Sequence, residues 1–141
     1  MNPQRSFKPL LDPLFRLYRI SFWFYQPDYV IIVDPTLLRG TNCFSGLKDN
    51  GIAIISDRQG LEIPKVKASQ KVFVLPANDI ALKTIGRPLG NTALLGGFCA
   101  ATGELELNIL VEAVKNRFSG KAQEGNIQAV REGFEFVKNK L

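Results

Sequence analysis

The sequence has 141 residues, of which 45% are hydrophobic and 22% are charged, a composition that suits one globular domain and excludes a disordered chain. Its 18 lysines and arginines exceed its 13 aspartates and glutamates but form no basic run, so a solvated surface is favoured and no nucleic-acid partner is expected. A coenzyme A-like molecule or an acidic protein is left open as a partner. The sequence has no histidine and only two cysteines, which excludes histidine-activated catalysis and, from a single copy, a four-cysteine iron–sulfur cluster.

The amino-terminal segment, residues 1–24, is atypical. The run Leu14–Tyr25 is aromatic and apolar, but Arg16 and Arg19 interrupt it, and it is shorter than the ~20 apolar residues that a membrane-spanning helix needs. A peripheral membrane helix is one alternative. An edge strand, or a surface covered by a partner subunit, is favoured. We expect no membrane span and a cytoplasmic protein, because two cysteines without a disulfide framework fit a reducing compartment.

Three apolar runs predict the strands of a parallel sheet. Tyr29–Val33 shows no polar alternation, which is typical of a strand buried on both faces. Ile52–Ile55 and Val72–Leu75 are the second and third predicted strands, and each is preceded by a segment long enough for a crossover. The predicted fold class is therefore α/β, with a parallel, Rossmann-like, three-layer sheet and a helical carboxyl-terminal half.

A helix is expected directly after the first strand. Pro35 suits the first helical position, where its missing N–H group is not needed, and Asp34 is expected to cap that helix. The side chains of Leu37 and Leu38 are then expected to face back to the sheet.

The carboxyl-terminal half shows helical signals throughout. Asn78 or Asp79 is expected to cap a helix that stops at Gly86, and Asn91 is expected to cap a second helix that runs to Gly103. Two further amphipathic helices are predicted from apolar residues at helical spacing, which are Leu107, Leu110, Val111, Val114 and Phe118 in one helix and Ile127, Val130, Phe134 and Val137 in the other.

The candidate ligand site lies where the predicted strands end, because ligands of parallel α/β sheets gather beyond the carboxyl ends of the strands. Arg58 can hold a phosphate or carboxylate in a forked contact, and Thr36 and Ser56 can donate hydrogen bonds to the same group. These three residues are the predicted cofactor-binding residues. No catalytic residue and no metal ligand is assigned. Helix capping is favoured over ligand contact for Asp34 and Asn78.

Several separated motifs resemble one known family. They are Tyr25–Leu38 with its Asp34-Pro35-Thr36 turn, then Gly86-Arg87-Pro88 and Asn91-Thr92, and then Arg117-Phe118, Asn126, Ala129 and Gly133-Phe134-Glu135 in the closing helices. From about Tyr25 to the end, the sequence resembles the gamma subunit, or gamma domain, of the 2-oxoacid:ferredoxin oxidoreductases. We accordingly expect a gamma-like domain at residues 25–141. The strand, Gly-Gly-Gln-Gly loop and helix that precede the matched region in that family are not found in this sequence.

The resemblance implies a subunit that is inactive alone. In the implied complex, thiamine diphosphate and iron–sulfur clusters lie on other subunits, which are the alpha, beta and ferredoxin-like delta subunits. The complex decarboxylates a 2-oxoacid oxidatively, passes electrons to ferredoxin and transfers the acyl group to coenzyme A. The resemblance does not distinguish among pyruvate, ketoisovalerate and 2-oxoglutarate as the substrate. A stand-alone, non-catalytic α/β module that binds a small ligand, or a truncated paralogue, is the alternative.

The resemblance also favours a subunit interface on the small-residue helix and the turn before it. Arg87, Asn91, Thr92 and Gly96 are its predicted interface residues. The simplest interpretation of the small residues of this helix is close packing within the domain, since a helical glycine costs about 1 kcal/mol relative to alanine and needs some compensation. Packing against a sister chain is the other interpretation.

Overall fold

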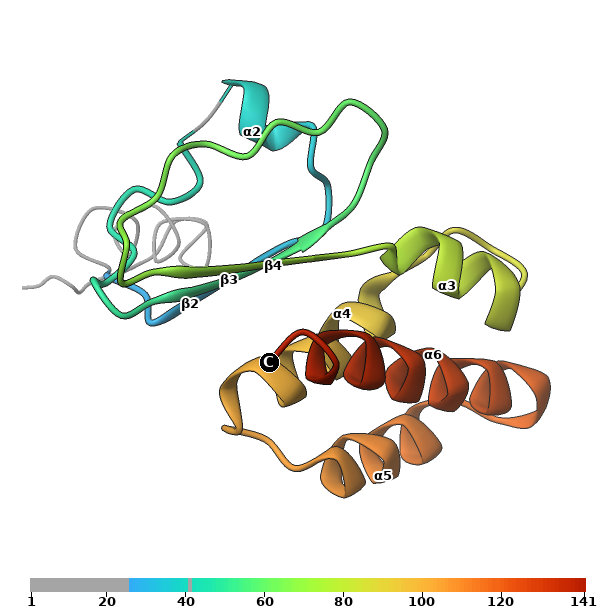
Figure 1. Cartoon of the computed structure of the whole chain (residues 1–141). Helices are drawn as coiled ribbons and strands as arrows, with labels where there is room; N and C mark the ends of the chain where they lie inside the picture. Colours follow the sequence, from blue (N-terminus) through green and yellow to red (C-terminus); the bar gives the residue numbers. More distant parts are fainter. Residues whose placement is uncertain (1–25, 41) are drawn as a thin grey trace, which may run out of the picture.

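The computed structural model describes residues 26–40 and 42–141 of the chain (Figure 1). The predictions made for the aromatic segment Leu14–Tyr25 lie outside the described residues.

Three parallel strands form the sheet, in the order β2-β3-β4. They are β2 (Tyr29–Ile32), β3 (Ile52–Ser56) and β4 (Lys71–Leu75). Tyr29 pairs with Ile52, and Ile52 pairs with Lys71, so all three strands start at the same end of the sheet. The predicted parallel α/β sheet is confirmed.

One face of the sheet is covered by the two strand crossovers. The first contains the short helix α2 (Leu37–Gly40), and the second, residues 57–70, has no helix or strand. Their apolar side chains cover the sheet together, because Phe44 and Leu47 pack on Ile32, Ala53 and Ile55, with Leu61 and Val66 against them. The Gln70 side chain ties the crossovers together, since its Nε2 donates hydrogen bonds to the carbonyls of Leu47 and Lys48, each at 3.1 Å.

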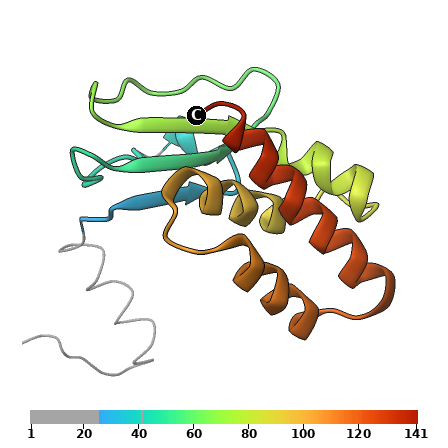
Figure 2. The ribbon, with the colours of Figure 1, turned by 60° about the horizontal axis from the view of Figure 1, so that its bottom comes forward.

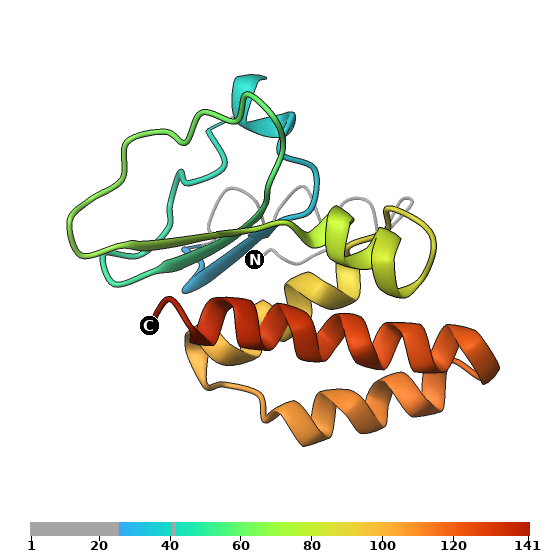
Figure 3. The same cartoon turned by 45° about the vertical axis from the view of Figure 1, so that its right-hand side comes forward.

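Four helices lie on the opposite side of the sheet, as Figures 1 and 2 show. They are α3 (Ala77–Thr84), α4 (Asn91–Thr102), α5 (Leu107–Arg117) and α6 (Gly120–Lys138). α4 packs against β3 and β4, α6 packs against β4 and crosses α4, and α5 runs alongside α6 on the side away from the sheet (Figure 3). Gly86 follows α3 with φ 85° and Gly103 caps α4 with φ 68°, so both predicted helix ends are confirmed.

The crossing of α4 and α6 depends on two glycines. A Cβ atom on Gly96 would lie 2.0 Å from the carbonyl oxygen of Val130, and a Cβ atom on Gly133 would lie 2.0 Å from that of Ala93. The two helices therefore touch backbone to backbone at both points. This contact supports the core cluster in which Ile54 of β3 packs with residues of α3, α4 and α6.

The expected burial on both faces of the first strand is wrong. β2 ends at Ile32, and 36% of Ile31 is exposed, as are 47% of Val33 and 54% of Leu37. The physical reason is position. In the described part of the sheet β2 is an edge strand, while α4 and α6 lie over β3 and β4. Of the two leucines expected to face the sheet, only Leu38 packs against the core.

Two expected helix caps are also wrong. α3 begins at Ala77 with Pro76 in the cap position, so neither Asn78 nor Asp79 caps it. Asn91 is the first residue of α4, and its cap position is occupied by Gly90, with no side-chain hydrogen bond. The Asn78 side chain instead accepts a hydrogen bond from the Gly90 amide at 3.2 Å, which holds the start of α4 against α3.

Candidate functional site

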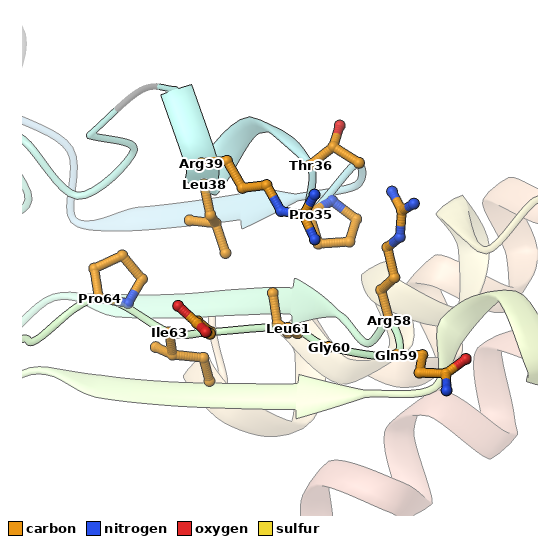
Figure 4. Close-up of a pocket in the computed structure, with 11 residues that line it drawn as sticks. Pro35, Thr36, Leu38, Arg39, Arg58, Gln59, Gly60, Leu61, Ile63 and Pro64 are labelled. Carbon is orange, nitrogen blue, oxygen red and sulfur yellow. The ribbon is translucent and has the colours of Figure 1, made fainter.

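A cavity of about 520 Å³ opens between α2 and the segment that follows β3. Figure 4 shows Arg39 and Arg58 reaching towards the Pro35–Thr36 turn from two different segments. The lining residues are Pro35, Thr36, Leu38, Arg39, Arg58, Gln59, Gly60, Leu61, Glu62, Ile63 and Pro64. The structure therefore brings two predicted site residues, Thr36 and Arg58, to one cavity.

Arg39 is a member of this site that the sequence analysis did not identify. It lies three residues after Thr36, a spacing that places two side chains on the same side of a helical turn, so the spacing was a usable signal. Within the described residues, neither Arg39 nor Arg58 forms an ion pair with a carboxylate. Two guanidinium groups without such a partner suit a phosphate or a carboxylate.

The turn before α2 is held by the Asp34 carboxylate. Its Oδ1 accepts hydrogen bonds from the Thr36 hydroxyl at 2.6 Å and from the Thr36 amide at 3.0 Å. These two bonds, together with the positive charge of Arg58, lower the pKa of Asp34 from its ordinary value. Asp34 thus stays ionised at neutral pH and orients Thr36 rather than binding an anion itself.

Arg58 also lines a second cavity of about 400 Å³ on the other side of the turn. Asp34, Asn78 and Asn91 line it as well, so the ends of the three strands and the start of α4 converge there. This convergence is the arrangement expected at the carboxyl edge of a parallel sheet.

Ser56, the third predicted cofactor-binding residue, lies apart from both cavities. It is fully buried and lines neither of them. Because side chains alternate along a strand, Ser56 points to the same face as Ile54, which packs against the helices. Its hydroxyl has no hydrogen-bond partner among the described residues.

The four predicted interface residues lie in different environments. Arg87 and Asn91 are exposed, and Thr92 is half-buried with its hydroxyl 2.9 Å from Oδ1 of Asn126. Gly96 is buried against α6, which agrees with the interpretation of packing within the domain.

The described residues contain no group of three side chains that could hold a metal ion. Burial raises the pKa of the Cys99 thiol, so this cysteine acts as a small core residue in a cluster with Leu110 and Val114. No helix formed by the described residues has the length and hydropathy needed to cross a membrane.

Comparison with known proteins decides the family. Residues 16–136 match the family model described as pyruvate ferredoxin/flavodoxin oxidoreductase. This chain belongs to that family. The match confirms the resemblance and also takes in part of the segment before Tyr25.

Curated members of this family identify the subunit that the chain resembles. It is 39% identical over 120 residues to the common gamma subunit of the pyruvate/ketoisovalerate oxidoreductases of Pyrococcus furiosus, covering 83% of this chain and 65% of that subunit. It is 36% identical over 140 residues to pyruvate synthase subunit PorC of Methanothermobacter thermautotrophicus, covering 96% of this chain and 72% of that protein. The chain thus spans somewhat less than two thirds of the Pyrococcus relative.

Solved structures of the family show the same fold. The pyruvate oxidoreductase subunit PORC of Thermotoga maritima superposes with a TM-score of 0.66 at 28% identity, covering 79% of this chain and 64% of that one. The gamma subunit of a keto/oxoacid ferredoxin oxidoreductase from Geobacter sulfurreducens superposes with a TM-score of 0.67 over the same shares, and at 22% identity it supports the fold alone.

Proposed function

We propose that this chain is a gamma-type subunit of a multisubunit 2-oxoacid:ferredoxin oxidoreductase, an enzyme that converts a 2-oxoacid oxidatively to an acyl-CoA. The observation that carries the proposal is the family match over residues 16–136, supported by the gamma subunits among its relatives. Pyruvate and ketoisovalerate are the substrates to test first, because the relatives' names contain them, and 2-oxoglutarate is the third candidate.

The chemistry of the proposed complex is divided among its subunits. The two cysteines of this sequence cannot hold a four-cysteine cluster, so the iron–sulfur clusters are assigned to other subunits. These are the alpha, beta and ferredoxin-like delta subunits, to which the family resemblance also assigns thiamine diphosphate. The proposed gamma-like domain is residues 25–141. We propose a cytoplasmic location, because both cysteines are free thiols.

We propose that the cavity lined by Thr36, Arg39 and Arg58 binds coenzyme A. Coenzyme A supplies the thiol that takes up the acyl group, and its phosphates are the groups that arginine forks recognise. In this proposal both guanidinium groups bind the phosphates, while Asp34 holds the Thr36 hydroxyl in place. Arg87, Asn91 and Thr92 are assigned to a contact between subunits.

The first test is reconstitution with the sister subunits. We expect the isolated chain to give no 2-oxoacid-dependent reduction of ferredoxin, and the co-expressed complex to give coenzyme A-dependent turnover that is lost when this chain is omitted. Size-exclusion chromatography and a ferredoxin-reduction assay measure the two effects. If the chain neither joins the complex nor changes its activity, the subunit assignment fails and the stand-alone ligand-binding module replaces it.

The second test addresses the coenzyme A assignment. In the reconstituted complex, Arg58→Ala is expected to raise the KM for coenzyme A at least about tenfold, because one charge-assisted contact is worth roughly 1.5–3 kcal/mol and each 1.4 kcal/mol is a factor of about ten. The KM for the 2-oxoacid should not change. Arg131→Ala, which removes an exposed arginine of α6 that lines neither cavity of the site, is the matched control. Equal KM values for coenzyme A in both variants would contradict the proposal that Arg58 binds coenzyme A.

A further inference from the structure

A groove of about 740 Å³ lies at the end of the helical layer, where the α3–α4 connection meets the end of α5 and the start of α6. Its apolar lining includes Ile85, Leu89 and Phe118, and 56% of Leu89 is exposed. Ile85 and Phe118 pack against two different core clusters, so the groove lies over the seam between them. An exposed leucine in a concave apolar surface marks a site that a partner can fill.

The polar groups at the groove floor already have partners. The Thr92 hydroxyl lies 2.9 Å from Oδ1 of Asn126, and Nδ2 of Asn126 donates to the Ala122 carbonyl at 2.8 Å. α6 also lies close to the end of α3 beside the groove, because a Cβ atom on Gly125 would lie 2.5 Å from the carbonyl oxygen of Thr84, a lining residue. An apolar side chain therefore fits beside Thr92 and Asn126 without displacing either hydrogen bond.

The charged residues of the groove all have one sign. Arg87 and Lys121 line it, and none of the carboxylates in residues 26–40 and 42–141 does. The start of α4 is at the same rim, and this helix of 12 residues has no side-chain cap, so its dipole adds positive potential there. The complementary surface is an apolar side chain flanked by carboxylates.

Such a surface exists on this chain, at the opposite end of α5. Ile109 is 55% exposed on that helix. Glu106 and Glu112 lie three residues before and three residues after it, so both carboxylates flank the isoleucine on one side of the helix. Within the described residues Glu112 pairs only with Lys115, in an exposed contact that is worth little.

We propose that the groove binds Ile109 of a second copy of this chain, with Glu106 and Glu112 facing Arg87 and Lys121. Because the groove and Ile109 lie at opposite ends of α5, two copies related by a two-fold axis with antiparallel α5 helices make the contact twice. This inference rests on the proposed function in one respect, which is that the proposed function also assigns Arg87 to a contact between subunits. The partner proposed here is a second copy of the same chain.

The test is a charge exchange between two double variants, measured on the isolated chain by sedimentation velocity from about 1 μM to about 1 mM, the range of weak association. The parent is expected to dimerise. Arg87→Glu with Lys121→Glu, and separately Glu106→Lys with Glu112→Lys, should each raise the dimer Kd at least tenfold, because each variant sets like charges against like. An equimolar mixture of the two variants should restore the parent Kd to within about threefold, since both contacts of the mixed dimer are then complementary.

The matched control is Lys71→Glu with Arg131→Glu, which changes the net charge equally at exposed positions outside the groove. It should dimerise like the parent. Ile109→Ser should raise the Kd without any change in charge. A parent that stays monomeric throughout, a mixture that does not associate, or a control that loses association overturns the inference. Because no sister subunit is present, each of these results leaves the oxidoreductase assignment intact.

Discussion

Gly96→Leu is expected to destabilise the domain by about 3 kcal/mol or more, the upper range for forcing a larger side chain into a packed interior. The obstacle is backbone rather than a flexible side chain, because a Cβ atom would lie 2.0 Å from the Val130 carbonyl oxygen. Relief requires α4 and α6 to separate, which would also break the reciprocal contact at Gly133. Urea unfolding followed by circular dichroism gives the free energy of unfolding.

Gly40→Ala is the matched control for this prediction. Nothing lies within 4 Å of a Cβ atom at Gly40, and its φ is not in the left-handed region, so alanine should be neutral or stabilise by up to about 1 kcal/mol. If Gly96→Leu unfolds at the parent's urea midpoint, the close crossing of α4 and α6 is not present in solution. If it unfolds early, loss of subunit binding by this variant reports the fold and not an interface.

Ile54→Ala should cost about 2–5 kcal/mol, the range for removing a buried branched side chain from a core that cannot collapse around the cavity. Ile54 is fully buried between the sheet and the helices. Its register partner on β2 is Ile31, which has the same chemistry but is 36% exposed. Ile31→Ala should therefore cost about 1 kcal/mol or less.

The two isoleucine variants form an internal comparison, since their side chains point to the same face of neighbouring strands. Urea midpoints at equal slopes measure the difference. Equal losses for the two variants would mean that β2 is covered in solution as completely as β3. A loss confined to Ile54 supports a core centred on β3 and β4.

The parallel strands could be predicted because short runs rich in β-branched residues, separated by segments long enough for crossovers, are typical of parallel sheets. Helix ends at Gly86 and Gly103 could also be predicted, since only glycine takes a positive φ at little cost, and both have one. Which helices and loops cover each face of the sheet could not be predicted. Ile31 and Val33 read as core residues from sequence, but their exposure depends on how far α4 and α6 reach across the sheet.

The sequence predicted that the candidate site lies at the carboxyl ends of the parallel strands, but it did not predict every side chain that lines the site. Thr36 and Arg58 follow strands and line the same cavity, while their role in binding a cofactor stays a prediction. Ser56 is still within β3, and side-chain alternation turns it towards the helices. Arg39 was missed because the prediction considered only residues that directly follow a strand. The sequence indicated that another backbone segment packs closely against Gly96. It could not show that this segment is α6 of the same chain, because that depends on the tertiary fold.

The core of this domain can be completed only after α6 has been synthesised, because α6 supplies part of that core. α6 spans Gly120–Lys138 and contacts α3, α4, α5 and β4, and its Ala129 and Val137 belong to the same core cluster as Ile54. The strands leave the ribosome first, but their helix-facing side remains without its last layer until α6 has emerged. During that interval the nascent sheet exposes apolar surface to other chains and to chaperones.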